Sequence, residues 1–302
     1  MTQLFDTILT QPFAQVLKFI LGFVGSYGLA LIIFTVLTKL IMVPFQIKSK
    51  KATFDQRRLS PQIKAIEKKY KDDKVKYNEE MQKLYEQEGF NPMGGCLPTL
   101  ITLPIIMGLY GVITKPLSNL MKLDAGRIAE VASRLGVEAA SNGTYNEIAL
   151  AEMLHGNLPR LVDISPDLFE INFGFLGFNL AETPLINNFS LLWLLPILSA
   201  LTGYIYMTIN QKYMPPMEGS MASTNKMMNL TMPIMSLIIG FSLPAGVTLY
   251  WITGNLFMMA QEPLLQWYLS KSYYAEIEAR DASKKSKKKK KKPAAEEGSE
   301  IE

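Results

Sequence analysis

Long apolar stretches alternate with densely charged segments along the 302 residues of this chain. A helix that crosses a bilayer needs roughly 20 mainly apolar residues at ~1.5 Å per residue. Stretches of that kind occupy residues 26–47, 92–114 and 189–211, and an uncharged run covers 227–261. They are too long for the buried helices of a soluble domain, so the pattern predicts an all-α integral membrane protein.

The last run is about twice as long as one span. Pro244, Ala245 and Gly246 lie near its middle, where a tight turn would divide it into helices at residues 227–243 and 244–270. Each helix would contain only about 17 apolar residues, ~26 Å in length against a hydrocarbon core of ~30 Å. We therefore expect five transmembrane helices, with local thinning of the bilayer beside the last two.

The N-terminal region, residues 1–25, has a different pattern. Within residues 4–21, apolar residues recur at helical spacing among polar ones, which is typical of an amphipathic helix at the membrane surface. No clear cleavage site follows it, so we expect this helix to be retained.

Three polar segments separate the expected spans. Residues 48–91 carry two amphipathic stripes around a turn at 71–73, which predicts a helical hairpin. Residues 115–188 form a long, net acidic loop with helix-like pieces near 125–135 and 145–154. A short polar connection follows the third span.

Positive charge is concentrated in the hairpin, in the connection at residues 212–226 and in the tail at 271–302. With five spans these segments fall on one side, and the acidic loop falls on the other. The positive-inside rule then places the protein in the cell membrane with its N-terminus outside and its C-terminus in the cytoplasm. The tail is too charged to fold alone, and we expect it to be disordered.

The lysine run within that tail, residues 287–292, permits three interpretations. It could neutralise phosphates of ribosomal RNA, or bind the headgroups of anionic lipids. A merely solvated tail is the third.

The chain contains one cysteine, Cys96, and one histidine, His155. An internal disulfide is excluded, and any metal site would depend on carboxylates or on another chain. His155 falls in the acidic loop and Cys96 at the cytoplasmic end of the second span, so the two cannot meet for nucleophilic catalysis. We expect no enzyme activity and no cofactor.

Lys39 is the most informative residue of the first span. It lies nine residues before Lys48, or ~13 Å along a helix from the cytoplasmic end. An ammonium at that depth costs at least ~2.5 kcal/mol unless it meets water or polar partners. We expect a hydrated cavity on the face that Lys39 shares with Thr35, although a tilted helix with a snorkelling lysine is an alternative. Further polar groups could come from Asn229, Asn255 and Gln261.

Tyr250 and Trp251 lie deep in the expected fifth span, where they could contact a hydrophobic guest or simply pack between helices. The last three spans are also rich in methionine, which suits a surface that adapts to many apolar partners but is equally typical of lipid-facing filler. These methionines are Met207, Met227, Met228, Met232, Met235, Met258 and Met259.

Several short motifs occur in a fixed order along residues 5–269, and together they resemble the YidC/Oxa/Alb family of membrane protein insertases. The motifs are YGLA at 27–30, TVLTK at 35–39 with Pro44, LSP at 59–61, NPMGGCLP at 91–98, LPI at 103–105, LY at 109–110, Phe241, PAGV at 244–247, LYW at 249–251 and NL at 255–256.

The resemblance implies five core helices around a water-filled groove that opens to the cytoplasm and to lipid and is closed on the outer side. Lys39 occupies the position of the buried positive charge, where most members have arginine, which has a planar fork of five donors. Thr35 would line the groove, and Ile106, Tyr250 and Trp251 would face the passing transmembrane segment.

The resemblance also implies a function and partners. The protein would insert integral membrane proteins and help them fold, with the hairpin making early contact with nascent clients. The ribosome, the Sec translocon and anionic lipids are the other expected partners.

Two other functions fit the residues. An anion-selective channel or solute transporter could use Lys39 for selection, although no internal repeat of the alternating-access kind is evident. An assembly factor that binds partner helices without moving them is the second alternative.

Overall fold

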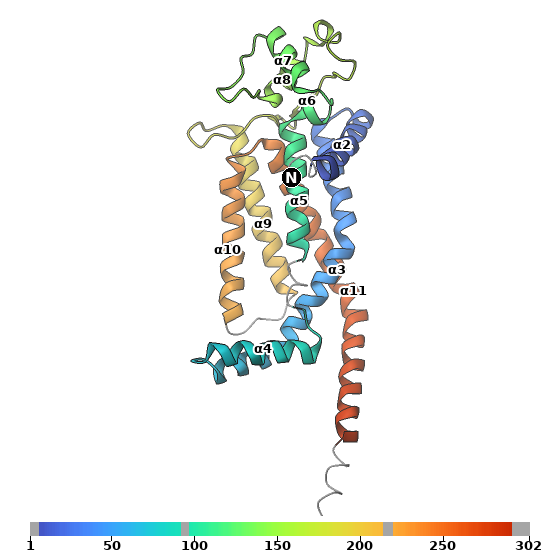
Figure 1. Cartoon of the computed structure of the whole chain (residues 1–302), viewed down its shortest axis with the longest axis vertical. Coiled ribbons are helices and arrows are strands. Elements are labelled where there is room, and N and C mark those ends of the chain that lie inside the picture. The colour runs from blue at the N-terminus through green and yellow to red at the C-terminus, as the bar shows by residue number, and fades with distance from the viewer. Residues whose placement is uncertain (1–5, 92–96, 214–219, 292–302) are drawn as a thin grey trace, which may run out of the picture. The chain divides into compact units, whose positions relative to one another are not determined.

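The computed structural model describes residues 6–91, 97–213 and 220–291, and most of them are helical (Figure 1). The chain divides into two compact units, Met1–Met259 and Ala260–Glu302, which are described separately. In chain order the elements are the π-helix η1 (Asp6–Thr10), α2 (Gln11–Val24), α3 (Tyr27–Lys69), α4 (Lys74–Glu88), α5 (Leu97–Thr114), α6 (Pro116–Asn119), α7 (Ala125–Arg134), α8 (Glu147–Met153), the 3₁₀-helix η3 (Leu158–Arg160), β1 (Gly174–Phe175), β2 (Phe178–Asn179), the 3₁₀-helix η4 (Leu191–Trp193), α9 (Leu194–Lys212), α10 (Ser220–Gly240) and α11 (Ala245–Lys291).

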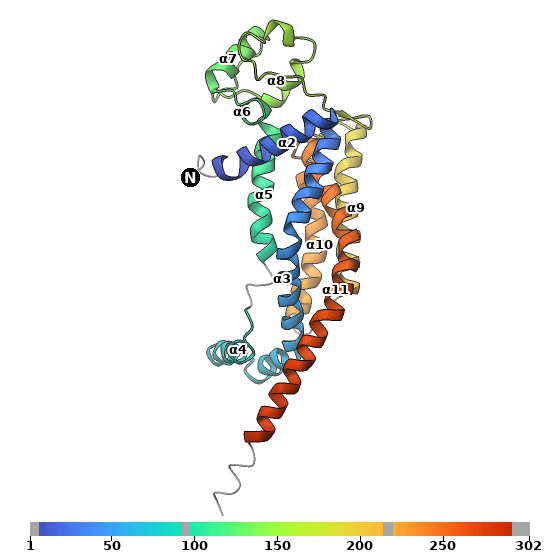
Figure 2. The same ribbon diagram turned by 90° about the vertical axis from the view of Figure 1, so that its right-hand side faces the viewer.

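Two helical stretches among the described residues are long and apolar enough to cross a membrane, Tyr27–Ala52 and Leu191–Lys212. Shorter apolar helical stretches cover Ile8–Val24, Ile101–Thr114 and Thr231–Gly240. Helices α9 and α10 lie side by side along their length (Figures 1 and 2). Five transmembrane helices remain a prediction.

Helix α3 does not end where the first span was expected to end, at residue 47. It continues to Lys69 and so includes the first arm of the hairpin. The change from apolar to charged residues at Lys48 marks a change of surroundings, and no glycine interrupts the helix after Gly28. Pro44 and Pro61 both lie inside it.

The hairpin closes between α3 and α4 around a small apolar cluster of its own. This cluster is built from Leu59, Ile63, Met81 and Leu84. At its base, the Arg58 guanidinium forms an ion pair with Glu88 at 2.8 Å. The two amphipathic stripes therefore pack against each other.

The turn expected near residues 244–246 is present between α10 and α11. Helix α10 ends at Gly240, and the first free N–H groups of α11 point to the 115–188 segment. The backbone N–H of Ala245 donates to the carbonyl of Glu182 at 2.8 Å, and that of Gly246 donates to Leu180 at 2.9 Å. These bonds satisfy two donors that a helix start otherwise leaves unpaired.

The expectation that residues 271–302 are disordered is corrected in part, because α11 continues to Lys291. No glycine or proline occurs after Pro263 within the helix, and lysine, alanine and glutamate are good helix formers. Within the second unit, Lys271 Nζ lies 4.5 Å from the centre of the Trp267 ring. Residues 292–302 lie outside the described residues.

Helix α2 crosses α3 and α5 instead of running beside them (Figure 2). Ala14, Leu17, Ile20 and Leu21 are buried on one face. On the opposite side Val16, Phe19 and Phe23 are exposed, with 78% of Phe19 and 88% of Phe23 accessible. Both faces are therefore apolar, which agrees with a helix that lies between the protein and lipid.

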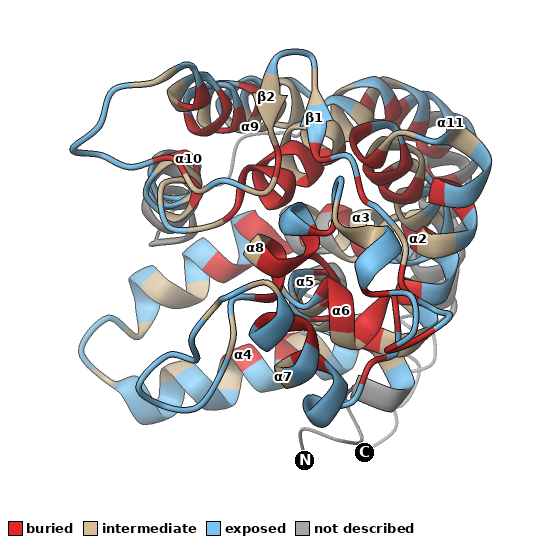
Figure 3. Cartoon of the chain, turned by 90° about the horizontal axis from the view of Figure 1, so that it is seen from above, coloured by how far each residue is buried: buried red, intermediate tan, exposed pale blue. Residues whose placement is uncertain are grey.

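The 115–188 segment folds over the ends of α3, α5 and α11 and shares their hydrophobic core. Buried residues gather where α5, α6 and α8 lie together (Figure 3). The buried carboxylate of Glu147 on α8 accepts hydrogen bonds from the backbone N–H and the hydroxyl of Ser118, at 2.7 and 2.6 Å. The two helix-like pieces expected in this segment correspond to α7 and α8.

The all-α prediction missed a short antiparallel hairpin, β1 and β2, in which Gly174 pairs with Asn179 and Phe175 with Phe178. The Phe175 side chain packs onto Gly28 of α3, and a methyl group built at Gly28 would overlap the ring.

We predict that Gly28→Ala lowers the thermal unfolding temperature of the protein in detergent. Overpacking of this kind costs ~1–3 kcal/mol, because Phe175 must move out of its packed position. Gly22→Ala is the matched control, since a methyl group there meets open space and alanine favours a helix. Equal unfolding temperatures for Gly28→Ala and the unaltered protein would contradict the packing described here.

Candidate functional site

Lys39 lies on α3 with its ammonium group close to an aromatic ring of α11. Its Nζ atom is 5.8 Å from the centre of the Tyr250 ring. A cation within ~6 Å of a ring centre is attracted by the electrons of the ring face. Tyr250 is only 3% exposed, so this face is fixed by its surroundings.

Gly254 provides the space for the Lys39 side chain. A methyl group at Gly254 would lie 2.9 Å from Lys39 Cε and 3.3 Å from Nζ. Gly254 is four residues after Tyr250, so both lie on the same face of α11. The lysine therefore lies along a strip of α11 that has a ring at one turn and no side chain at the next.

Thr35 is fully buried beside this strip, and its Cγ2 is 4.0 Å from the same methyl position at Gly254. Its hydroxyl donates to the carbonyl of Leu31 at 2.6 Å, within α3. Thr35 thus turns its methyl group toward Gly254 and keeps its hydroxyl hydrogen bond within α3.

The charge on Lys39 is not neutralised by the described part of the chain. Among the residues whose side chains the structure describes, no carboxylate forms an ion pair with its Nζ atom. An ammonium in an apolar bundle needs water, a polar group or an incoming anion.

Ile106 and Trp251, the other predicted site residues, are partly buried and pack against the main hydrophobic core. Ile106 lies on α5 and Trp251 follows Tyr250 on α11. The structure thus brings Lys39, Thr35 and Tyr250 together, and it places Ile106 and Trp251 in the packing around that core.

Asn255 was considered as a partner for Lys39, but the structure gives it other partners. Its side-chain amide donates to the carbonyl of Ser199 at 3.3 Å and to the Thr202 hydroxyl at 3.2 Å, both on α9. The Ser199 hydroxyl is in turn 2.7 Å from that of Ser236 on α10. This polar cluster joins α9, α10 and α11.

Sequence reasoning missed both Gly254 and this polar cluster. The available signals were a glycine one turn after Tyr250 and small polar residues at i, i+3 spacing in an apolar helix, a pattern typical of close helix contacts. The side chain of Asn229 lies outside what the structure describes. Gln261 belongs to the second unit.

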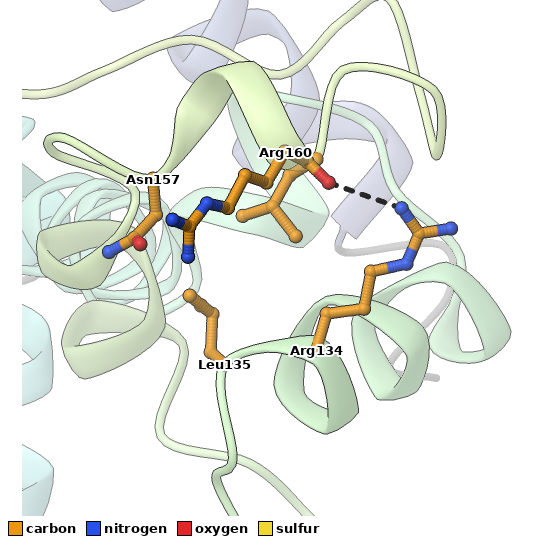
Figure 4. Close-up of a pocket in the computed structure, with 5 residues that line it drawn as sticks. Arg134, Leu135, Asn157 and Arg160 are labelled. Atoms are coloured by element: carbon orange, nitrogen blue, oxygen red, sulfur yellow. Dashed lines mark hydrogen bonds between the residues drawn. The ribbon is translucent and has the colours of Figure 1, made fainter.

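A separate hollow of about 270 Å³ lies in the 115–188 segment, lined by Arg134, Leu135, Asn157, Arg160 and Leu161 (Figure 4). Arg134 donates to the Arg160 carbonyl at 3.2 Å and pairs with Asp163 and Glu130, each at 2.7 Å. The pair with Arg134 lowers the pKa of Asp163. The Arg134 guanidinium in this hollow is therefore already paired with two neighbouring carboxylates.

The two residues considered for catalysis give no site. His155 is exposed, and its Nδ1 is 2.9 Å from a carboxylate oxygen of Glu170 in the same segment. Cys96 lies outside the described residues.

We predict that the effects of Gly254→Ala and Lys39→Ala on the thermal unfolding temperature are not additive, because Gly254→Ala displaces the Lys39 side chain and has nothing to displace once Lys39 is alanine. Residues 39 and 254 should therefore be coupled by ~0.5–3 kcal/mol. Gly203→Ala is the control, because a methyl group there meets only an ordinary 3.5 Å contact. Strictly additive effects would show that Lys39 does not lie on Gly254.

The sequence of this chain is similar to known proteins over most of its length. Residues 19–273 match the family model described as the 60Kd inner membrane protein. The membrane protein insertase YidC 1 of Bacillus cereus is 28% identical over 273 residues, which cover 88% of this chain and 82% of that protein.

Two longer relatives are similar over only part of their length. The membrane protein insertase YidC of Granulibacter bethesdensis is 30% identical over 85% of this chain and 38% of that protein. The chloroplastic ALBINO3-like protein 1 of Arabidopsis thaliana is 32% identical over 80% of this chain and 44% of that protein. Because the family model covers most of the sequence, this chain belongs to the 60Kd inner membrane protein family, the YidC/Oxa/Alb family of membrane protein insertases.

Proposed function

We propose that this protein inserts other membrane proteins into the cell membrane and helps them fold, using a hydrated groove between α3 and α11 in which Lys39 supplies the positive charge. The observation that supports this most is the Lys39 ammonium, which lies on Tyr250 and Gly254 with no carboxylate of the described residues beside it.

The physical task is to carry the polar end of a client through hydrocarbon. Polar and charged groups pay a large desolvation cost there unless they meet water or partners. Lys39 would attract acidic residues in the leading segment of the client, and groove water would shorten the apolar path. Neither a nucleotide nor a metal is needed for this mechanism.

The contacts at the end of the bundle near the 115–188 segment support a groove that is closed on that side. The carbonyls of Leu180 and Glu182 cap the start of α11, and the shared core fills the space beneath them. Lys39 is 12 residues along α3 from Tyr27, ~18 Å at 1.5 Å per residue. The charge would therefore lie well inside the membrane and below the closed end.

The apolar helix of the client would leave the groove sideways into lipid. Tyr250, Trp251 and Ile106 would contact it from α11 and α5. Exposed methionines on α10, including Met232 and Met235, would add soft and adaptable contacts.

We extend the proposal to the partners and the orientation. The hairpin and the C-terminal lysines would lie in the cytoplasm, where they can meet nascent clients, the ribosome, the Sec translocon or anionic lipids. The N-terminus and the 115–188 segment would lie outside.

We predict that Lys39→Arg retains insertion and that Lys39→Glu loses most of it, because arginine keeps the charge and glutamate reverses it. The measurement is insertion of a model client in cells depleted of the native protein and complemented by each variant. We expect a loss of at least ~10-fold for Lys39→Glu, which corresponds to ~1.4 kcal/mol.

Lys48→Glu is the matched control, since Lys48 lies on the same helix but is exposed. It should leave insertion close to that of the unaltered protein. Equal insertion by Lys39→Arg and Lys39→Glu would remove the charge from the mechanism.

A further inference from the structure

A patch of exposed apolar side chains lies just before α9 and is not used by the proposed groove. Leu185, Ile186, Phe189 and Leu191 are 54%, 69%, 83% and 57% exposed. We call residues 185–191 the apolar loop. Such a concentration of exposed apolar residues on one short loop indicates that something covers it.

The apolar loop continues directly into a helix face that is also exposed and apolar. Leu194, Ile197, Leu198 and Leu201 follow at i, i+3, i+4 and i+7, so they form one stripe of α9. This stripe belongs to a stretch that is long and apolar enough to cross the membrane, Leu191–Lys212. No charged residue occurs between Glu182 and Lys212. What covers the stripe can therefore cover the loop as well.

Trp193 forms hydrogen bonds with backbone carbonyl groups of the apolar loop. Its indole N–H donates to the carbonyl of Leu185 at 2.9 Å and approaches that of Asn188 at 3.2 Å. The N–H of Asn188 donates to Leu185 and that of Trp193 to Ser190, at 3.2 and 3.1 Å. Internal bonds of this kind are what a non-helical segment needs at a membrane surface, where unpaired backbone groups are costly.

The same tryptophan holds the loop against the helix bundle. Its ring lies 5.3 Å from the Phe189 ring and 4.9 Å from the Phe241 ring, which follows α10. Tryptophan is enriched at the boundary between lipid headgroups and acyl chains, because it has an apolar body and a polar N–H. The apolar loop, the start of the α9 region and the residue after α10 thus meet in one aromatic cluster of Phe189, Trp193 and Phe241.

We propose that the apolar loop is an interfacial anchor, inserted among the lipids of the leaflet on the side of the 115–188 segment, with Ile186 and Phe189 pointing into the acyl chains. Its occupant is lipid, because the loop is continuous with the exposed apolar stripe of α9 and carries no charge. The anchor would fix the depth of α9 and hold the 115–188 segment at the surface. It is independent of the charge on Lys39.

The test uses a spin label on a single cysteine in the full chain. Cys96, the one cysteine of the sequence, is replaced by serine, and Ile186→Cys or Ala139→Cys is labelled in vesicles of phosphatidylcholine and phosphatidylglycerol. Ala139 is an exposed residue of the same segment and serves as the water-facing control. The readout is the accessibility of each label to oxygen, which collects in acyl chains, and to a polar nickel complex.

The label at residue 186 should be accessible to oxygen and protected from nickel, and the label at 139 should show the reverse. Trp193→Phe, which keeps a ring but loses the N–H, should move the label at 186 toward water. Equal nickel access at 186 and 139 would overturn the proposal. Protection of residue 186 from both reagents, with broadening that grows with protein density in the vesicles, would identify a second copy of the chain as the occupant and would also overturn it.

Discussion

A single ammonium group inside an apolar membrane helix is the constraint on which the rest of this structure depends. A charged lysine is costly in hydrocarbon unless it meets water or polar partners. The chain meets this demand in part, with the Tyr250 ring beside the charge and the bare backbone of Gly254 beneath the side chain. In the proposed function, water and an incoming acidic group would supply the remainder.

The neighbouring contacts keep this arrangement in place. Helix α11 begins where the 115–188 segment supplies carbonyl acceptors for Ala245 and Gly246, and Asn255 binds it to α9. The end near the 115–188 segment is therefore packed and hydrogen-bonded, while Lys39, further along α3, has no ion pair with the carboxylates whose side chains the structure describes. In the proposed mechanism this difference between the two ends would let polar segments enter from one side only.

Local patterns in the sequence predict much of this fold, but not all of it. The turn before Ala245 was predicted from its proline and glycine, and α7 and α8 were predicted as helix-like stretches near residues 125–135 and 145–154. The continuity of α3 to Lys69 and of α11 to Lys291 was missed, because a change from apolar to charged residues marks where the environment changes and not where a helix ends. Lys39 stood out by its depth alone. Its placement on Gly254, more than 200 residues away in sequence, depends on how two helices pack, which the glycine one turn after Tyr250 signals only weakly.

The central claim is that clients pass through the space beside Lys39 and Tyr250. It is tested most directly by replacing each residue with a photoreactive amino acid and crosslinking to a ribosome-tethered nascent membrane protein. Met153, exposed in the 115–188 segment, is the control position. We predict crosslinks from positions 39 and 250 and none from 153. The absence of crosslinks at both 39 and 250, in membranes where the protein is folded, would contradict the account.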